Sequence, residues 1–211
     1  MLNWGVRIAL RVRVKLYGRE NMINGPAVII MNHQSNFDPL LHGPAFPINT
    51  VIIGKKELLK IPFWGRLFKS TNNILVDRKK KDTVSKGAPH KAIRNDKGGG
   101  TEEAILRLNE DDCYIWIFPE GTRSHGNALG KFKSGAFVIA IEAQVPIIPI
   151  ISKPLHQVLD IPNKIAPGGQ HEIKILPAIS TAGTTIDLLP QLIKDCEKLY
   201  KTELEKYAKV E

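Results

Sequence analysis

The sequence predicts an α/β fold in a single domain, with a mainly parallel or mixed central sheet flanked by helices. Several short apolar runs lack a polar face, which is typical of strands that are buried on both sides of a sheet. Segments with helical periodicity lie between these runs, as in a sheet whose strands are connected by helices. The length of 211 residues and the hydrophobic fraction of 43% fit one globular domain, so residues 1–211 are treated as one unit.

The first strand is expected in residues 10–17, where apolar and basic residues alternate as in a half-buried strand. A Gly-Pro pair at 25–26 indicates a turn before the second strand, AVIIM at 27–31. This second run has no polar face, so we expect it to be covered on both sides. Further strands are expected at 50–53, 74–76, 113–118 and 146–151.

Helices are expected after Asp38 and at 58–69, 102–109, 134–143 and 187–208. Because strands and helices alternate, functional residues are expected in loops that follow the carboxyl ends of the strands. Residues 78–100 are rich in Lys and Gly and are expected to form a mobile basic surface loop. A nucleic-acid-binding arm is the alternative for this loop, but it lacks interleaved aromatic residues that would stack on bases.

The charge and the cysteine content limit the partners. Lys and Arg total 30 against 21 acidic residues, and the net charge of +9 favours nucleic acid, a phosphorylated metabolite or an acidic membrane surface. Cys113 and Cys196 are far apart and have no metal-ligand spacing. This argues against a disulfide framework or a zinc site and favours a reducing cytoplasm.

Hydropathy argues against a membrane span. A spanning helix needs roughly 18 or more apolar residues, and the closest window, 135–152, contains Glu142, Gln144 and two prolines. The N-terminus contains several arginines and no long apolar segment, so it does not resemble a secretory signal. Hydropathy does not exclude attachment to a membrane surface.

Residues 31–40, MNHQSNFDPL, contain the first candidate for chemistry. His33 and Asp38 follow the second strand, and a carboxylate that holds one imidazole nitrogen lets the other nitrogen take a proton from a hydroxyl. The alternative is that Asn32, Ser35 and Asp38 cap the next helix and that His33 is merely exposed.

FPEGTRS, residues 118–124, brings polar groups to the end of another apolar run, CYIWI. Arg123 can make bidentate hydrogen bonds to a phosphate, and Gly121 lets the backbone approach a ligand closely. Glu120 and Thr122 lie in the same stretch. The alternative is a plain β-turn, which the Pro-Glu-Gly sequence favours.

Two further stretches follow the same pattern. ILVDR at 74–78 ends in Asp77 and Arg78, and Arg78 either joins Arg123 in neutralising a phosphate dianion or forms a surface ion pair. VPIIPI at 145–150 is either the wall of a groove or a strand of the core.

Together the four stretches resemble the glycerolipid acyltransferase family, which includes the 1-acylglycerol-3-phosphate acyltransferases. NHQSNFD matches the His-x4-Asp block, NNILVDR the block that ends in arginine, FPEGTRS the third block at every position and VPIIPI the fourth. The blocks occur in the family's order and span residues 32–150. Asn72 stands where the second block usually begins with glycine, and the apolar N-terminal segment of many relatives is missing here.

The resemblance implies transfer of a fatty acyl group from acyl-CoA or acyl carrier protein to the free hydroxyl of lysophosphatidic acid, which makes phosphatidic acid. His33 would then be the base and Asp38 would orient it. The residues expected to bind the acceptor are Arg78, Glu120, Gly121, Thr122 and Arg123. No metal and no bound cofactor is expected, because thioester acyl transfer needs neither.

A substrate with a long acyl chain implies docking to an anionic membrane surface, on the cytoplasmic face and without a transmembrane span. Residues 1–26 are expected to supply a membrane-facing segment and the first strand. The stretch LLKIPFWGRLFK at 58–69, with Trp64, is either a second docking segment or part of the core.

Three alternatives remain. Within the enzyme class, glycerol-3-phosphate or another lysophospholipid is the alternative acceptor. A non-catalytic lipid-binding protein would not need the pair His33 and Asp38. A nucleic-acid-binding protein would leave FPEGTRS unexplained, so no nucleic-acid partner is expected.

Overall fold

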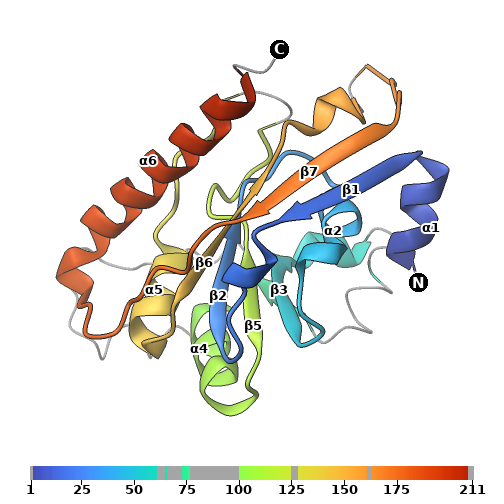
Figure 1. The fold of residues 1–211 in the computed structure, drawn as a ribbon. Helices are drawn as coiled ribbons and strands as arrows, with labels where there is room; N and C mark the ends of the chain where they lie inside the picture. The colour runs from blue at the N-terminus through green and yellow to red at the C-terminus, as the bar shows by residue number, and fades with distance from the viewer. Residues whose placement is uncertain are drawn as a thin grey trace.

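Seven strands form one sheet in the order β1-β7-β6-β2-β5-β3-β4 (Figure 1). The structure is a computed structural model, and it describes residues 2–60, 65, 73–76, 100–124, 128–160 and 163–208. The strands are β1 (Val12–Tyr17), β2 (Ala27–Met31), β3 (Thr50–Lys55), β4 (Ile74–Val76), β5 (Tyr114–Ile117), β6 (Ile147–Ser152) and β7 (Gly169–Ile175).

The predicted mainly parallel or mixed sheet is confirmed. Every neighbouring pair of strands is parallel except β6 and β7, which are antiparallel. Six of the strands lie where they were predicted, β1 from its alternating pattern and five from apolar runs, and β7 was not predicted. In β7 the residues that enter the core alternate with half-buried polar residues, so this strand has no continuous apolar run; the buried ones are His171, Ile173 and Ile175.

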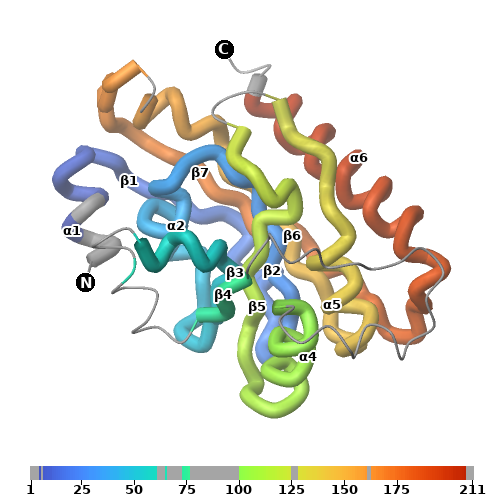
Figure 2. Tube along the Cα trace, turned by 180° about the vertical axis from the view of Figure 1, so that it is seen from behind, coloured from blue at the N-terminus to red at the C-terminus, as the bar shows by residue number. Residues whose placement is uncertain are grey.

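Helices cover both faces of the sheet (Figures 1 and 2). They are α1 (Leu2–Ala9), α2 (Asp38–Leu41), α4 (Gly100–Glu110), α5 (Gly135–Ala143) and α6 (Leu189–Ala208). The helices expected at 102–109, 134–143 and 187–208 and the short one after Asp38 are confirmed. Within 58–69, residues 58–60 end a short 3₁₀ helix (Lys56–Lys60), and 61–64 and 66–69 lie outside the described residues. Residues 78–99 also lie outside them.

The central strand β2 shows why an apolar run without a polar face predicts a sheet covered on both sides. Val28 and Ile30 pack in the core beneath α4, α5 and α6, whereas Ile29 and Met31 pack in the core on the opposite face. All four side chains are fully buried, and each such burial contributes roughly 1.5–3 kcal/mol to folding. The stretch VPIIPI is a core strand as well, because every residue of β6 is buried.

A proline lies inside this core. Pro149 of β6 is paired with Ile30 of β2, and proline has no N–H for the ladder of the sheet. The hydroxyl of Tyr200 on α6 accepts the N–H of Ile150 at 3.2 Å and donates to the carbonyl of Ile30 at 2.7 Å. A buried side chain therefore provides polar contacts between the two central strands, and its burial raises the pKa of Tyr200 well above the usual value.

The parallel strands β6, β2, β5, β3 and β4 end at the same edge of the sheet. The loops that carry His33 and residues 118–124 follow β2 and β5, so they meet at this edge. Among the described residues, no helix has the length and apolar character needed to cross a membrane.

Candidate active site

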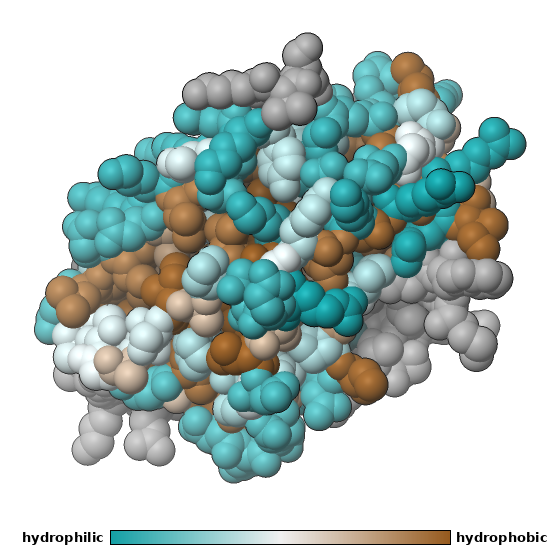
Figure 3. Space-filling view, in the orientation of Figure 1, coloured by the Kyte–Doolittle hydropathy of each residue, from teal (hydrophilic) through white to brown (hydrophobic). Residues whose placement is uncertain are grey.

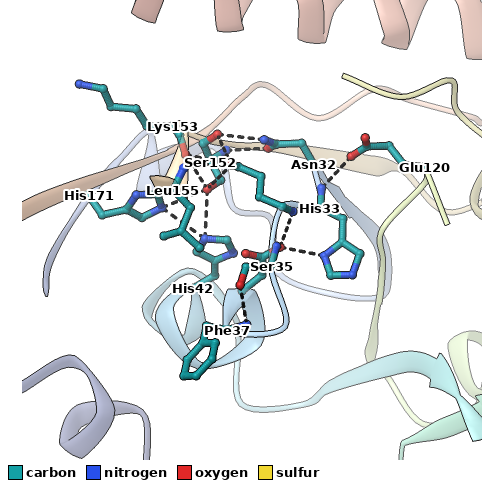
Figure 4. A network of polar contacts seen from close by, with 12 residues as sticks. Asn32, His33, Ser35, Phe37, His42, Glu120, Ser152, Lys153, Leu155 and His171 are labelled. Carbon is teal, nitrogen blue, oxygen red and sulfur yellow. Dashed lines mark hydrogen bonds and ion pairs between the residues drawn. The ribbon is translucent and has the colours of Figure 1, made fainter. Parts of the chain in front are cut away.

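The imidazole of His33 lies directly against the carboxylate of Asp38. The distance from His33 Nδ1 to Asp38 Oδ2 is 2.8 Å. Figure 4 shows the ring of His33 below the end of β2 with this contact drawn. Because a carboxylate accepts hydrogen bonds, Nδ1 carries the proton and the lone pair of Nε2 is left for another partner.

The carboxylate of Asp38 is itself fixed in place by backbone N–H groups. Its Oδ2 atom also accepts the backbone N–H groups of Gln34 at 2.7 Å and Ser35 at 3.0 Å. The side chain is fully buried, and among the described residues its Oδ1 atom has no hydrogen-bond partner. Three donors around one oxygen fix the position and the rotamer of the carboxylate.

The alternative of helix caps and an exposed histidine is wrong. No side chain caps α2, and the side chain of Asn32 contacts Ser152 at the end of β6 instead. The side chain of His33 is 18% exposed and stacks on Phe118 with the ring centres 3.9 Å apart. The histidine is therefore partly sheltered and fixed in orientation.

Glu120 connects the two predicted motifs. Its carboxylate accepts the backbone N–H of His33 at 2.7 Å and the backbone N–H of Gly130 at 2.8 Å. The N–H of Ser124 donates to the carbonyl of His33 at 2.8 Å, so both backbone groups of His33 are bound by the segment after β5, through Glu120 and Ser124. Burial raises the pKa of Glu120, and the two N–H contacts oppose that shift.

The β-turn expected at Pro-Glu-Gly is present together with the site. The N–H of Gly121 donates to the carbonyl of Phe118 at 3.0 Å. Gly121 has a φ angle of +67°, a conformation that favours glycine. The turn therefore explains the glycine and directs Glu120 towards His33.

A cavity of about 230 Å³ opens beside the imidazole. Gly121, Thr122 and Arg123 line it together with His33, so four of the predicted site residues meet there. Its apolar wall consists of Ile52, Ile53, Leu58, Val76, Ile117 and Phe118. Arg78 and Asn72 lie outside the described residues. The cavity combines a candidate base, a cation and an apolar wall.

Lys55, which was not predicted as a site residue, ends β3 and lines the same cavity. The available signal was its place two residues after the expected strand at 50–53. Lys55 and Arg123 give the cavity two cationic side chains, the composition that binds a phosphate. In the part of the chain that the structure describes, no group of three or more His, Cys, Asp or Glu side chains is arranged to hold a metal ion.

Comparisons with known proteins agree with this geometry. The family model "Acyltransferase" matches residues 13–153. The 1-acyl-sn-glycerol-3-phosphate acyltransferase of Haemophilus influenzae is 35% identical over 178 residues, which are 84% of this chain and 68% of that protein. The enzyme of the same name from Escherichia coli is 34% identical over 184 residues, 85% of this chain and 67% of that protein.

The match extends to a human relative and to a solved structure. Human 1-acyl-sn-glycerol-3-phosphate acyltransferase alpha is 32% identical, over 86% of this chain and 60% of its own length. The crystal structure of the 1-acyl-sn-glycerophosphate acyltransferase of Thermotoga maritima superposes with a TM-score of 0.72 and 23% identity. The superposition covers 97% of this chain and 76% of the Thermotoga maritima chain, so the two proteins have the same fold. The chain belongs to the acyltransferase family.

Proposed function

We propose that this protein transfers a fatty acyl group from a thioester to the free hydroxyl of lysophosphatidic acid and makes phosphatidic acid. The observation that carries the proposal is the contact of His33 with Asp38 beside a cavity that also contains Arg123. The names of relatives from bacteria and human support the same acceptor.

The reaction follows from the orientation of His33. Its Nε2 atom takes the proton of the acceptor hydroxyl, and the resulting oxygen nucleophile attacks the thioester carbonyl carbon. The tetrahedral intermediate then expels the thiolate as the carbon–sulfur bond breaks. The thiolate takes the proton from the His33 imidazolium, which restores the base. Asp38 stabilises that imidazolium and fixes its tautomer.

The acceptor's phosphate is assigned to the cationic side of the cavity. Arg123 and Lys55 line it, and Arg78 is proposed as a further cation on the basis of the sequence. Thr122 and Gly121 form the adjacent wall, where the hydroxyl of Thr122 is proposed to bind the glycerol. Glu120 acts indirectly in this proposal, because its carboxylate holds the backbone of His33.

The donor is proposed to be acyl-CoA or acyl carrier protein, whose thioester already carries an activated acyl group. The proposal therefore assigns no metal and no bound cofactor to the reaction. The apolar wall beside His33, formed in part by Ile52 and Phe118, suits an acyl chain.

Docking to an anionic membrane surface is part of the proposal, because both the acceptor and the product carry long acyl chains. Ile8 on α1 is 55% exposed, and Arg11, Arg13 and Lys15 are exposed where the chain continues into β1. Figure 3 shows hydrophilic side chains over β1. Each basic residue near an anionic surface contributes about 1 kcal/mol to binding.

Sedimentation with vesicles of phosphatidylglycerol or phosphatidylcholine tests the docking. We expect sedimentation with the anionic vesicles at low salt, and less of it at high salt or in Ile8→Ser. Leu106→Ser is the matched control, because Leu106 is 51% exposed on α4, far along the chain from the proposed surface. Equal losses in both variants, or no sedimentation at low salt, would contradict the proposal.

The activity is tested with a matrix of acceptors and donors, with released thiol as the readout. The acceptors are lysophosphatidic acid, glycerol-3-phosphate, a second lysophospholipid and monoacylglycerol, and each is combined with acyl-CoA and acyl carrier protein thioesters. We expect the highest kcat/KM with lysophosphatidic acid. A higher value with glycerol-3-phosphate or the second lysophospholipid would reassign the acceptor, and no thiol release in any combination would refute acyl transfer.

A further inference from the structure

The strand β6 ends at Ser152 beside the segment that carries His33, although the two are far apart in sequence. Ser152 is fully buried. Its backbone N–H donates to Asn32 Oδ1 at 2.8 Å, and its carbonyl accepts from Asn32 Nδ2 at 2.9 Å (Figure 4). The residue before His33 is thus attached to β6 by a pair of reciprocal hydrogen bonds.

The residue after His33 is attached to the same strand end. Gln34 Nε2 donates to the carbonyl of Lys153 at 2.9 Å and lies 3.2 Å from that of Ser152. Gln34 Oε1 accepts the N–H of Leu155 at 2.7 Å. Asn32 and Gln34 therefore hold the backbone on both sides of His33 against residues 152–155.

The hydroxyl of Ser152 contacts His42, the residue that follows the helix carrying Asp38. Ser152 Oγ lies 3.0 Å from Nε2 of His42 and 3.0 Å from Nε2 of His171. His42 follows α2, and its N–H donates to the carbonyl of Asp38 at 2.8 Å. Figure 4 shows the two imidazole rings converging on the serine.

Burial favours the neutral form of both rings in this cluster. His42 and His171 are 0% and 1% exposed, and burial lowers the pKa of His42 well below its usual value and that of His171 to about 4. A neutral imidazole offers one donor and one acceptor, so the hydroxyl can accept from one ring and donate to the other. A hydroxyl at position 152 can therefore bind both rings at once, whereas without it the two Nε2 atoms, which lie 3.3 Å apart, would be left with each other as partners.

We propose that Ser152 is a positioning residue for the pair His33 and Asp38. Its backbone fixes His33 through Asn32, and its hydroxyl fixes α2, and with it Asp38, through His42. Ser152 contributes no atom to the reaction in this account. The inference rests on the proposed function, because the pair it positions is the proposed base and its partner.

The expected effect is on turnover rather than on affinity. A displacement of about 1 Å in a reacting group costs up to 10²-fold in rate. Ser152→Ala keeps the backbone contacts with Asn32 and removes the hydroxyl, so His42 at the end of α2 loses its hydrogen bond to β6. We expect kcat with lysophosphatidic acid to fall about 10-fold, with the KM values of acceptor and donor unchanged within about 2-fold. Ser152→Cys, which keeps a weak hydrogen-bonding group of similar size, should recover part of the kcat.

Thr181→Val is the matched control for a lost buried hydroxyl. Thr181 is 1% exposed, and its hydroxyl lies 2.7 Å from the carbonyl of Val145 and 3.1 Å from that of Ala140, beyond the opposite end of β6. Both substitutions should lower the midpoint of thermal unfolding, but Thr181→Val should keep the wild-type kcat. Equal losses of kcat in Ser152→Ala and Thr181→Val, or an unchanged kcat in Ser152→Ala, would overturn the positioning role.

A second readout separates this inference from the proposed function. In the full chain with ¹⁵N-labelled histidine, the Nδ1–H signal of His33 is identified by its loss in His33→Ala. We expect this signal to shift or broaden in Ser152→Ala and to stay unchanged in Thr181→Val. An unchanged signal in Ser152→Ala refutes the inference even if the protein acylates lysophosphatidic acid. A shifted signal supports it even if the matrix of acceptors gives no activity. If Ser152→Ala does not fold, Ser152→Cys carries the same comparison.

Discussion

The backbone N–H of His33 donates a 2.7 Å hydrogen bond to the carboxylate of Glu120. The other carboxylate oxygen accepts the N–H of Gly130, so both oxygens face backbone donors. Glu120 itself is only 3% exposed. A side chain with two acceptors is therefore required at this position. The geometry explains why a glutamate, and not a glutamine, occupies position 120 beside His33.

Glu120→Gln should lower both stability and turnover. The amide has one acceptor oxygen, and its NH₂ group would face a backbone N–H, which leaves a buried donor unsatisfied at a cost of about 1–3 kcal/mol. Displacement of the His33 backbone should reduce kcat at least about 10-fold. Urea unfolding and thiol release measure the two effects.

Glu197→Gln is the control for this substitution. Glu197 on α6 also accepts a backbone N–H, that of Phe132 at 2.7 Å, but it has no contact with His33. Because Glu197 accepts this N–H with one oxygen, the amide oxygen of glutamine can replace it, so the variant should keep both its stability and its kcat. A normal kcat in Glu120→Gln would show that the carboxylate does not position His33.

His33→Ala should abolish measurable transfer and leave the fold intact. General-base catalysis is worth about 10²–10⁴-fold, and here the base would activate the nucleophile itself. Asp38→Asn should cost the same or less, because the amide oxygen can still accept from Nδ1 but the negative charge that stabilises the imidazolium is lost. Circular dichroism and acceptor binding are measured alongside. Wild-type turnover in folded His33→Ala would exclude the proposed mechanism.

Arg123→Ala should change the preference among acceptors. The guanidinium lines the cavity and can bind a phosphate with two charge-assisted hydrogen bonds, whereas monoacylglycerol has no phosphate to lose. We expect kcat/KM for lysophosphatidic acid to fall about 10-fold or more, and that for monoacylglycerol to stay nearly constant. Equal losses for the two acceptors would mean that Arg123 supports the loop after β5 instead.

His171 should make the free energy of unfolding depend on pH. Burial, with a smaller effect from Lys153, lowers its pKa to about 4, whereas an unfolded histidine titrates near 6.5. Its contribution is fully present above pH 6.5 and is lost as the pH falls towards 4, because the unfolded chain takes up a proton that the folded chain resists. At pH 5 the loss should be about 2 kcal/mol.

The measurement compares urea unfolding of the wild type and His171→Asn at pH 7 and pH 5. The variant should lose about 2 kcal/mol less than the wild type between these two values. Buried Glu120 has a raised pKa and shifts the stability in the opposite sense, but it is present in both proteins and cancels in the comparison. Identical losses in the two proteins would show that His171 takes up a proton in the folded state as readily as in the unfolded chain.

Local pattern was enough to predict the central sheet, whereas the pair His33 and Asp38 was favoured over helix caps only by the four stretches together and the family that they resemble. The runs that form β2 and β6 are apolar on both faces because helices cover both sides of the sheet, and this leaves a clear signal in sequence. The spacing of His33 and Asp38 places them across one short loop, so their contact is a local event.

The remaining features depend on long-range pairing. β7 carries an alternating pattern in which His171, Ile173 and Ile175 face inwards, and a period of two was available as a signal. Its antiparallel pairing with β6 and its parallel pairing with β1 have no local signal. The contact of Ser152 with Asn32 likewise has no local signal in the sequence, because it forms only when β2 and β6 are adjacent.

The pairing of β1 with β7 also has a consequence for the order of folding during synthesis. In the sheet that the structure describes, β1 is an edge strand whose neighbour is β7, so it emerges long before its partner is made. An unpaired strand edge is a template for association with other chains, and non-local pairing of this kind slows folding. The exposed Arg13 and Lys15 place repelling charges on β1 during the time before β7 has been synthesised. Neutralising both residues should therefore increase aggregation of the nascent chain. It should leave the free energy of unfolding of the finished protein nearly unchanged.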